Sequence, residues 1–157
     1  MRSAGLLADP AFPVNPGTKT KLKTQEDQNE NRKQLIEDAN SRIKTVAVQE
    51  ALGFLNDAGT GFLDLRDSAE LHRDGQIPGA VHVNRGMLEF ALDPSTAYHN
   101  PVLSSGKRII FYCASGGRSA LAADTAQSMG VSNVAHLSGG FRGWVEAGGP
   151  RLDAKMA

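Results

Sequence analysis

The single cysteine of the chain, Cys113, stands where an apolar segment gives way to a loop with two glycines. Residues 109–112 read Ile-Ile-Phe-Tyr, which is typical of a buried strand, and residues 113–119 read Cys-Ala-Ser-Gly-Gly-Arg-Ser. A helix-forming stretch, residues 120–129, follows directly. A thiol between a strand and a helix N-terminus lies near backbone N–H groups, which favour an anion. This arrangement predicts a thiolate nucleophile.

The loop residues suit an anion-binding turn. Gly116 and Gly117 tolerate positive φ angles, so the backbone N–H groups of residues 114–119 can turn toward one point. Ser119 is expected to donate a hydrogen bond to a loop carbonyl or to cap the helix. We also expect the sulfur to face a cleft that admits its substrate. The candidate anion-binding residues are Ala114, Ser115, Gly116, Gly117, Arg118 and Ser119.

Two arginines near this loop have alternative roles. Arg118 either faces an anionic substrate or braces the loop by pairing with an acid such as Asp64 or Glu70. We favour bracing, because the side chains of a short loop cannot all face one pocket. Arg66 follows Asp64 at the end of another expected strand, on the same edge of the sheet as the loop. We expect Asp64 and Arg66 to support the site, with a structural role favoured for the arginine.

Composition narrows the class of protein. The 157 residues suffice for one domain with a core, and 17 basic residues balance 17 acidic ones. Nucleic acids and anionic membranes usually require a basic excess, so we expect neither as a partner. No segment approaches the roughly 20 apolar residues of a membrane span, and residues 1–16 lack the apolar run of a secretory signal. We therefore expect a cytoplasmic location.

The content of cysteine and histidine bears on metals. One cysteine allows neither an internal disulfide nor a zinc site built on thiolate pairs, and it fits a reducing compartment. The histidines lack metal-binding spacing, so surface or structural roles are favoured over roles as ligands or as a base. They are His72, His82, His99 and His136. We expect no metal and no cofactor.

Strands alternate with helices from residue 43 onward, which predicts an α/β fold with a parallel sheet covered on both faces. The expected strands are residues 43–46, 62–65, 80–83, 108–112 and 134–137. The expected helices are residues 48–55, 68–73, 86–92, 120–129 and a short one around Trp144. Asp67 and Glu70 have the spacing of a capping box at the second helix. In such sheets ligands lie beyond the carboxyl ends of the strands, where Cys113 is expected.

Residues 1–42 are interpreted as an N-terminal arm that carries a polar helix over about residues 26–42. Leu35, Ile36, Ala39 and Ile43 form a narrow apolar stripe at helical spacing. A helix this polar is marginal alone, so we expect it to dock on the domain or on another subunit. Exchange of the arm between two copies would give a homodimer. Residues 153–157 form a tail.

Three segments, in this order, resemble parts of a rhodanese domain. The first is Leu-Asp-Leu-Arg at residues 63–66, with Glu70 and then Gly-Gln-Ile-Pro-Gly-Ala at residues 75–80. The second is C-x-x-G-x-R-S at residues 113–119. The third is G-G-x-x-x-W-x-x-x-G-x-P at residues 139–150. The resemblance covers residues 43–152 and is to the single-domain rhodanese, or sulfurtransferase, family.

This resemblance implies a central, mostly parallel five-stranded sheet with helices on both faces. It also implies sulfur transfer from a small anionic donor, such as thiosulfate, through a persulfide on Cys113 to cyanide, a thiol or a protein acceptor. The chain departs from the family pattern at Gln76, where histidine is usual, and at Arg85, where proline is common. Ala114 and Ser115 bring no basic side chains to the loop, which leaves the donor open.

Three alternatives belong to other functional classes. Cysteine phosphatases and arsenate reductases use C-x5-R loops, but Arg118 gives C-x4-R, one residue short for wrapping a phosphoryl group. A non-catalytic interaction module or a sulfur-delivery module is the second, and the retained Cys113 argues against the former. A redox sensor is the third, although no second cysteine is present to resolve an oxidised thiol.

Overall fold

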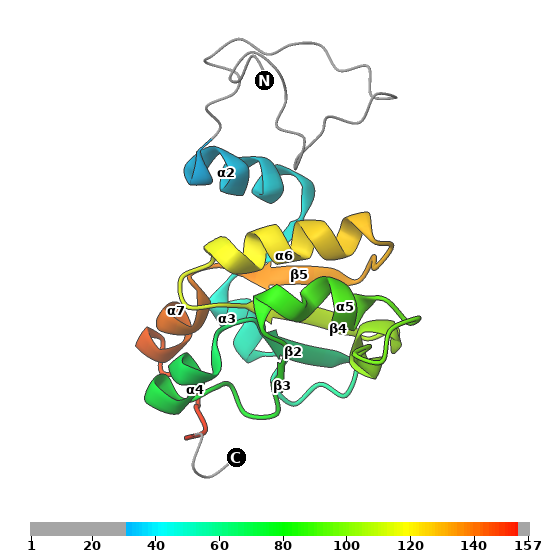
Figure 1. The fold of residues 1–157 in the computed structure, drawn as a ribbon. Coiled ribbons are helices and arrows are strands. Elements are labelled where there is room, and N and C mark those ends of the chain that lie inside the picture. The colour runs from blue at the N-terminus through cyan, green and yellow to red at the C-terminus, as the bar shows by residue number, and fades with distance from the viewer. Residues whose placement is uncertain (1–30, 154–157) are drawn as a thin grey trace, which may run out of the picture. The chain divides into compact units, whose positions relative to one another are not determined.

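Five strands form one sheet in the computed structural model, which describes residues 31–153 (Figure 1). Their order is β1-β5-β4-β2-β3 and every pairing is parallel, so the predicted five-stranded sheet is confirmed. The strands are β1 (Lys44–Val46), β2 (Thr60–Asp64), β3 (Val81–His82), β4 (Arg108–Tyr112) and β5 (Val134–Leu137). Predictions for residues 1–30 and 154–157 lie outside the described residues.

After its exposed first residue, Arg108, the central strand β4 consists of buried, mainly apolar residues, because both of its faces are covered. Successive side chains of a strand point to opposite faces. Ile109 and Phe111 pack into one core cluster, with side chains of α5 (Leu88–Leu92) and α6 (Gly117–Ser128). Ile110 and Tyr112 pack into a second cluster, with α3 (Val48–Leu52) and α7 (Gly140–Glu146). Helices therefore lie on both faces of the sheet, as predicted.

The shorter elements follow local signals in the sequence. The capping box predicted at α4 (Ser68–Asp74) is present: the Asp67 N–H donates to the Glu70 carboxylate at 2.9 Å. The helix predicted over residues 86–92 divides into a 3-10 turn, η2 (Arg85–Met87), and α5. The Asn84 side chain accepts from the Gly86 N–H at 2.9 Å, which fixes this tight turn. A second 3-10 turn, η3 (Pro101–Ser104), lies within the predicted loop.

Helix α2 (Arg32–Arg42) packs alongside α6, on the side away from the sheet (Figure 1). Asn31 caps its N-terminus. At its other end Arg42 makes a bidentate pair with Asp124 of α6 at 2.9 and 2.8 Å, and Gln127 donates to the Arg42 carbonyl at 2.8 Å. The helix is therefore docked within its own chain.

The apolar stripe predicted for this helix is only partly correct. Ala39 is fully buried and Ile36 is partly buried, whereas Leu35 is 45% exposed. Leu35 and Ile36 are neighbours in sequence, and their side chains point about 100° apart around the helix. When Ile36 faces the domain, Leu35 therefore remains exposed. The helix begins at Arg32, and residues 26–30 lie outside the described part of the chain.

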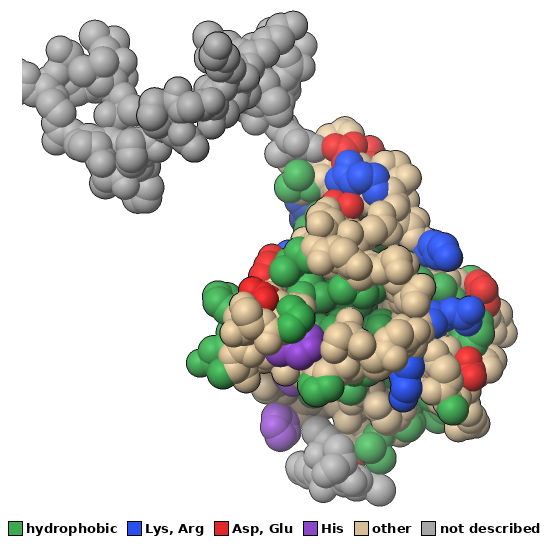
Figure 2. Space-filling model, turned by 90° about the vertical axis from the view of Figure 1, so that its right-hand side faces the viewer, with side chains coloured by type: hydrophobic (Ala, Val, Ile, Leu, Met, Phe, Trp, Pro, Cys, Tyr) green, Lys and Arg blue, Asp and Glu red, His purple; other side chains and the backbone are tan. Residues whose placement is uncertain are grey.

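The surface carries charges of both signs. On the face drawn in Figure 2, lysine and arginine side chains are interspersed with acidic ones and with hydrophobic side chains. Within residues 31–153, no helix has the length and apolar character needed to cross a membrane.

Candidate active site

Cys113 lies at the carboxyl edge of the sheet, directly after β4, and Asp64 ends the neighbouring strand β2. Helix α6 begins at Gly117, four residues beyond the cysteine. The strand, loop and helix therefore occur in the predicted order, and the sulfur lies where open α/β sheets bind their ligands.

Two backbone amides donate to the Cys113 sulfur. The Gly116 N–H lies 3.2 Å and the Ser119 N–H 3.3 Å from Sγ. The Ser119 hydroxyl oxygen lies 3.5 Å from the same sulfur and 3.2 Å from the Gly116 carbonyl oxygen. Gly116 has φ 117°, a backbone conformation that residues with a Cβ rarely adopt, and this turn directs its amide at the sulfur. The structure thus supplies a pair of donors rather than the full ring that we expected.

Backbone hydrogen bonds from the first turn of α7 fix the position of the cysteine loop. The Phe141 N–H donates to the Cys113 carbonyl at 2.8 Å, and the Arg142 N–H donates to the Ala114 carbonyl at 3.0 Å. This approach needs glycine at position 140, where φ is 63° and an added Cβ would lie 2.6 Å from the Cys113 carbonyl oxygen. The second glycine of the Gly139-Gly140 pair therefore serves the cysteine loop.

Arg118 braces the loop, as predicted. Its two terminal nitrogens each lie 2.8 Å from a carboxylate oxygen of Glu70, so of the two acids considered the partner is Glu70 rather than Asp64. The hydrogen bonds from Arg118, aided by the Asp67 N–H, lower the pKa of Glu70 from 4.5 to about 2 against the opposing effect of burial. This pair ties α4 to the start of α6.

The Glu70–Arg118 pair predicts a loss of stability in acid. A carboxyl whose pKa is lowered by folding stabilises the protein above its unfolded pKa, and this contribution disappears as the pH falls from about 4.5 toward 2. A fully buried pair with this shift would contribute about 3 kcal/mol, and we expect about 1–2 kcal/mol because the Arg118 side chain is 38% exposed. Chemical denaturation at several pH values measures it. In Glu70→Gln the fall over this range should be smaller by that amount, and an unchanged pH dependence would contradict the assignment.

Asp64 and Arg66 form a buried ion pair beside the loop. The Arg66 guanidinium donates to both Asp64 oxygens, at 3.0 and 2.7 Å, and to the Gly75 carbonyl at 2.7 Å. Neither side chain is more than 1% exposed. The guanidinium also lies 4.3 Å from the centre of the Phe141 ring, on the helix that holds the cysteine loop. These contacts agree with the structural role favoured for Arg66.

The expectation that the sulfur faces a cleft is wrong for this conformation. Cys113 is 1% exposed, because the loop amides, Ser119 and the start of α6 close around the thiol. Its loop neighbours nevertheless line two grooves. One, of about 350 Å³, lies beside Ala114; the other, of about 400 Å³, lies beside Ser115 and Gly116. Ala114 is half-buried and Ser115 is exposed.

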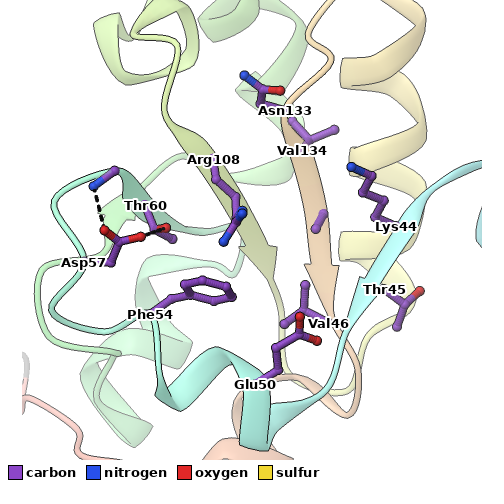
Figure 3. Close-up of a pocket in the computed structure, with 12 residues that line it drawn as sticks. Lys44, Thr45, Val46, Glu50, Phe54, Asp57, Thr60, Arg108, Asn133 and Val134 are labelled. Atoms are coloured by element: carbon purple, nitrogen blue, oxygen red, sulfur yellow. Dashed lines mark hydrogen bonds between the residues drawn. The ribbon is translucent and has the colours of Figure 1, made fainter.

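A pocket of about 610 Å³ lies at the opposite edge of the sheet (Figure 3). It is lined by Thr60, Arg108 and Val134, the first residues of β2, β4 and β5. Arg108 lies over the Phe54 ring at 4.3 Å. The whole length of β4 separates this pocket from Cys113, so it is not part of the cysteine site.

Sequence reasoning missed two residues near the cysteine. His136 of β5 is 4% exposed; its Nδ1 lies 3.1 Å from Ser119 Oγ, and its Nε2 lies 3.0 Å from Asn40 Oδ1. His136 was expected to be a surface or structural histidine, and Asn40 was not considered. The order of strands, which the sequence does not state, is what places β5 next to β4.

Within residues 31–153, no three His, Cys, Asp or Glu side chains gather in a way that would hold a metal ion.

Comparison with known proteins agrees with this fold. The Rhodanese-like domain family model matches residues 47–147, so the chain belongs to that family. It is 32% identical, over 67% of its length and 70% of the relative's, to the mouse thiosulfate sulfurtransferase/rhodanese-like domain-containing protein 3. It is 35% identical to the thiosulfate:glutathione sulfurtransferase of Saccharomyces cerevisiae, over 62% of this chain and 73% of that one.

Two solved structures have folds similar to that of this chain. A Rhodopseudomonas palustris protein of unknown function, described as a possible tyrosine phosphatase, is 40% identical with a TM-score of 0.76, and the match covers 87% of this chain and 100% of that one. The polysulfide-sulfur transferase of Wolinella succinogenes shares the fold at 24% identity and a TM-score of 0.60, over 82% and 90% of the two chains.

Proposed function

We propose that this protein is a sulfurtransferase in which Cys113 takes a sulfane sulfur from a small anionic donor and passes it to a thiophilic acceptor. The observation that carries the proposal is the pair of amides, from Gly116 and Ser119, directed at the Cys113 sulfur. Amide donors stabilise the negative charge that the sulfur carries when it reacts. A persulfide is also an anion, with its outer sulfur about 2 Å beyond Sγ, so the same loop suits the free and the loaded enzyme.

Thiosulfate is the proposed donor, and a thiol such as glutathione is the proposed acceptor. The names of the mouse and yeast relatives point to these substrates. The 350 Å³ groove beside Ala114 is the proposed approach for the donor, because four arginines and only two acids line it. The arginines are Arg66, Arg73, Arg142 and Arg151, and the acids are Asp74 and Glu146. Since the thiol is buried, loading requires a small opening of the loop. That requirement favours a donor that delivers a single atom.

A phosphatase is the competing function, because the description of the Rhodopseudomonas relative suggests it. Three features of the described site oppose it. The loop has C-x4-R spacing, Arg118 has both terminal nitrogens engaged by Glu70, and Cys113 is 1% exposed. A phosphoryl group needs several donors around its equatorial oxygens and room for them.

Thiosulfate carrying a radioactive outer sulfur tests the proposal. We expect the protein to acquire label, to release one sulfite for each label bound, and to yield labelled thiocyanate when cyanide is added. Absence of label from thiosulfate, 3-mercaptopyruvate and polysulfide would overturn the proposal in favour of an interaction module. Turnover of an aryl phosphate that is lost in Cys113→Ser would overturn it in favour of a phosphatase.

A further inference from the structure

A series of hydrogen-bonding groups leads from Cys113 to the docked helix α2. Ser119 Oγ lies 3.5 Å from Cys113 Sγ and 3.1 Å from Nδ1 of His136. On the other side of the ring, His136 Nε2 lies 3.0 Å from Oδ1 of Asn40. The four side chains come from the end of β4, α6, β5 and α2. Asn40 reaches the other three because α2 packs against α6.

The partner at Nε2 decides which ring nitrogen of His136 carries the proton. Asn40 Oδ1 can only accept, so Nε2 must donate. In the neutral ring Nδ1 is then an acceptor, and the Ser119 hydroxyl donates to it. The Ser119 oxygen keeps lone pairs for the Cys113 S–H. The hydroxyl can instead turn to the Gly116 carbonyl, 3.2 Å away.

We propose that His136 accepts the proton of Cys113 through Ser119, and that Asn40 holds the His136 ring in the tautomer that this requires. Both act as positioning residues. The reaction they serve is the sulfur transfer proposed above, on which this inference rests. As the thiol loses its proton to Ser119 Oγ, Ser119 passes its own proton to His136 Nδ1. Cys113 Sγ then bonds to the outer sulfur of thiosulfate, the S–S bond of thiosulfate breaks, and its electron pair leaves with sulfite. The imidazolium finally returns its proton to sulfite or to water.

The proton has a route out of the protein. His136 and Asn40 both line the 400 Å³ groove, between α2 and loop residues 115–117. Burial lowers the pKa of His136, which keeps the ring neutral and able to accept at neutral pH. Asn40 lies outside residues 47–147, so the N-terminal helix adds this group to the matched domain.

The protonation of His136 depends mainly on its hydrogen bonds with Ser119 and Asn40 rather than on charged neighbours. In register beside it, β1 and β4 present Thr45 and Phe111, which are uncharged. Of the residues that line this groove, Arg32 of α2 carries a charge. Elsewhere on α2 and α6, Arg42 pairs with Asp124 and Arg118 pairs with Glu70. A cation such as Arg32 disfavours imidazolium, as burial does. Sulfur loading should therefore slow as the pH falls through the lowered pKa of His136.

Substitutions at both positions test the proposal in the full-length protein. His136→Asn should slow loading from thiosulfate by roughly 10²-fold at pH 7 and abolish the acid decline of the rate. Asn40→Leu should slow it about tenfold, the order expected for one lost hydrogen bond. Asn40→Asp keeps an acceptor oxygen, so it should load at about the wild-type rate at pH 7. Its carboxylate favours the imidazolium, so the acid decline should move to higher pH. Lys33→Ala, at an exposed position of α2, is the matched control and should load like wild type.

Two further readouts separate this inference from the proposed function. Nitrogen-15 NMR should show the His136 proton on Nε2 in wild type and in Asn40→Asp, and a mixture of tautomers in Asn40→Leu. Alkylation of Cys113 by iodoacetamide, which needs the thiolate but no sulfur donor, should slow by the same factors as loading. A proton on Nδ1 in wild type, or normal alkylation in both His136→Asn and Asn40→Leu, would overturn the inference. If the NMR and alkylation results are as predicted but the protein accepts no sulfur from any donor, the proposed function is overturned and this inference is not.

Discussion

Replacing Cys113 by serine should abolish sulfur transfer from thiosulfate to cyanide, lowering turnover by roughly 10³-fold or more. Serine has nearly the same shape, so the amides of Gly116 and Ser119 can still donate to its oxygen. A neutral hydroxyl next to two amides is not ionised near pH 7, and a persulfide cannot form on oxygen. Thiocyanate production measures the effect.

A second thiol elsewhere should not rescue this variant. Ser132 is exposed and follows α6, away from the loop amides. The double variant Cys113→Ser/Ser132→Cys should therefore remain inactive, with a melting temperature close to that of wild type. Activity in the double variant would mean that any accessible thiol suffices, and the role given to the loop would then be wrong.

The largest effect on stability is expected at Arg66. Its replacement by methionine leaves the Asp64 carboxylate buried without its partner, which should lower the free energy of unfolding by about 3–5 kcal/mol. The double variant Asp64→Leu/Arg66→Met removes both charges and should recover a large part of the loss. Urea denaturation measures all three proteins.

Arg73→Met provides the matched control. Arg73 also pairs with a nearby aspartate, Asp74, but its side chain is 67% exposed. Exposed pairs contribute little, so this variant should unfold close to wild type. An Arg66→Met protein as stable as the Arg73→Met protein would show that the buried pair does not support the site.

Much of the fold could be predicted from local patterns. The apolar run before Cys113 identified the central strand, and the spacing of Asp67 and Glu70 identified the start of α4. Glycines marked the cysteine loop and the start of α7. These signals work because each depends on residues close together in the chain.

The rest of the site depends on contacts between distant segments. Asn40 and His136 are 96 residues apart, and nothing in their own surroundings in the sequence indicates that they meet. The burial of Cys113 likewise follows from the close fit of its loop, which composition does not reveal. Leu35 shows the same limit, since an apolar residue on a helix can remain exposed when its neighbour takes the packed face.

If Cys113 carries the transferred sulfur, the mass of the protein should change on incubation with thiosulfate. We expect a gain of one sulfur atom in wild type, located by trypsin digestion without reductant in the peptide of residues 109–118 that contains Cys113. Cyanide should remove this sulfur, and Cys113→Ser should gain none. A wild-type protein that stays at its original mass with every donor, or that carries the added sulfur outside this peptide, would show that Cys113 is not the sulfur carrier.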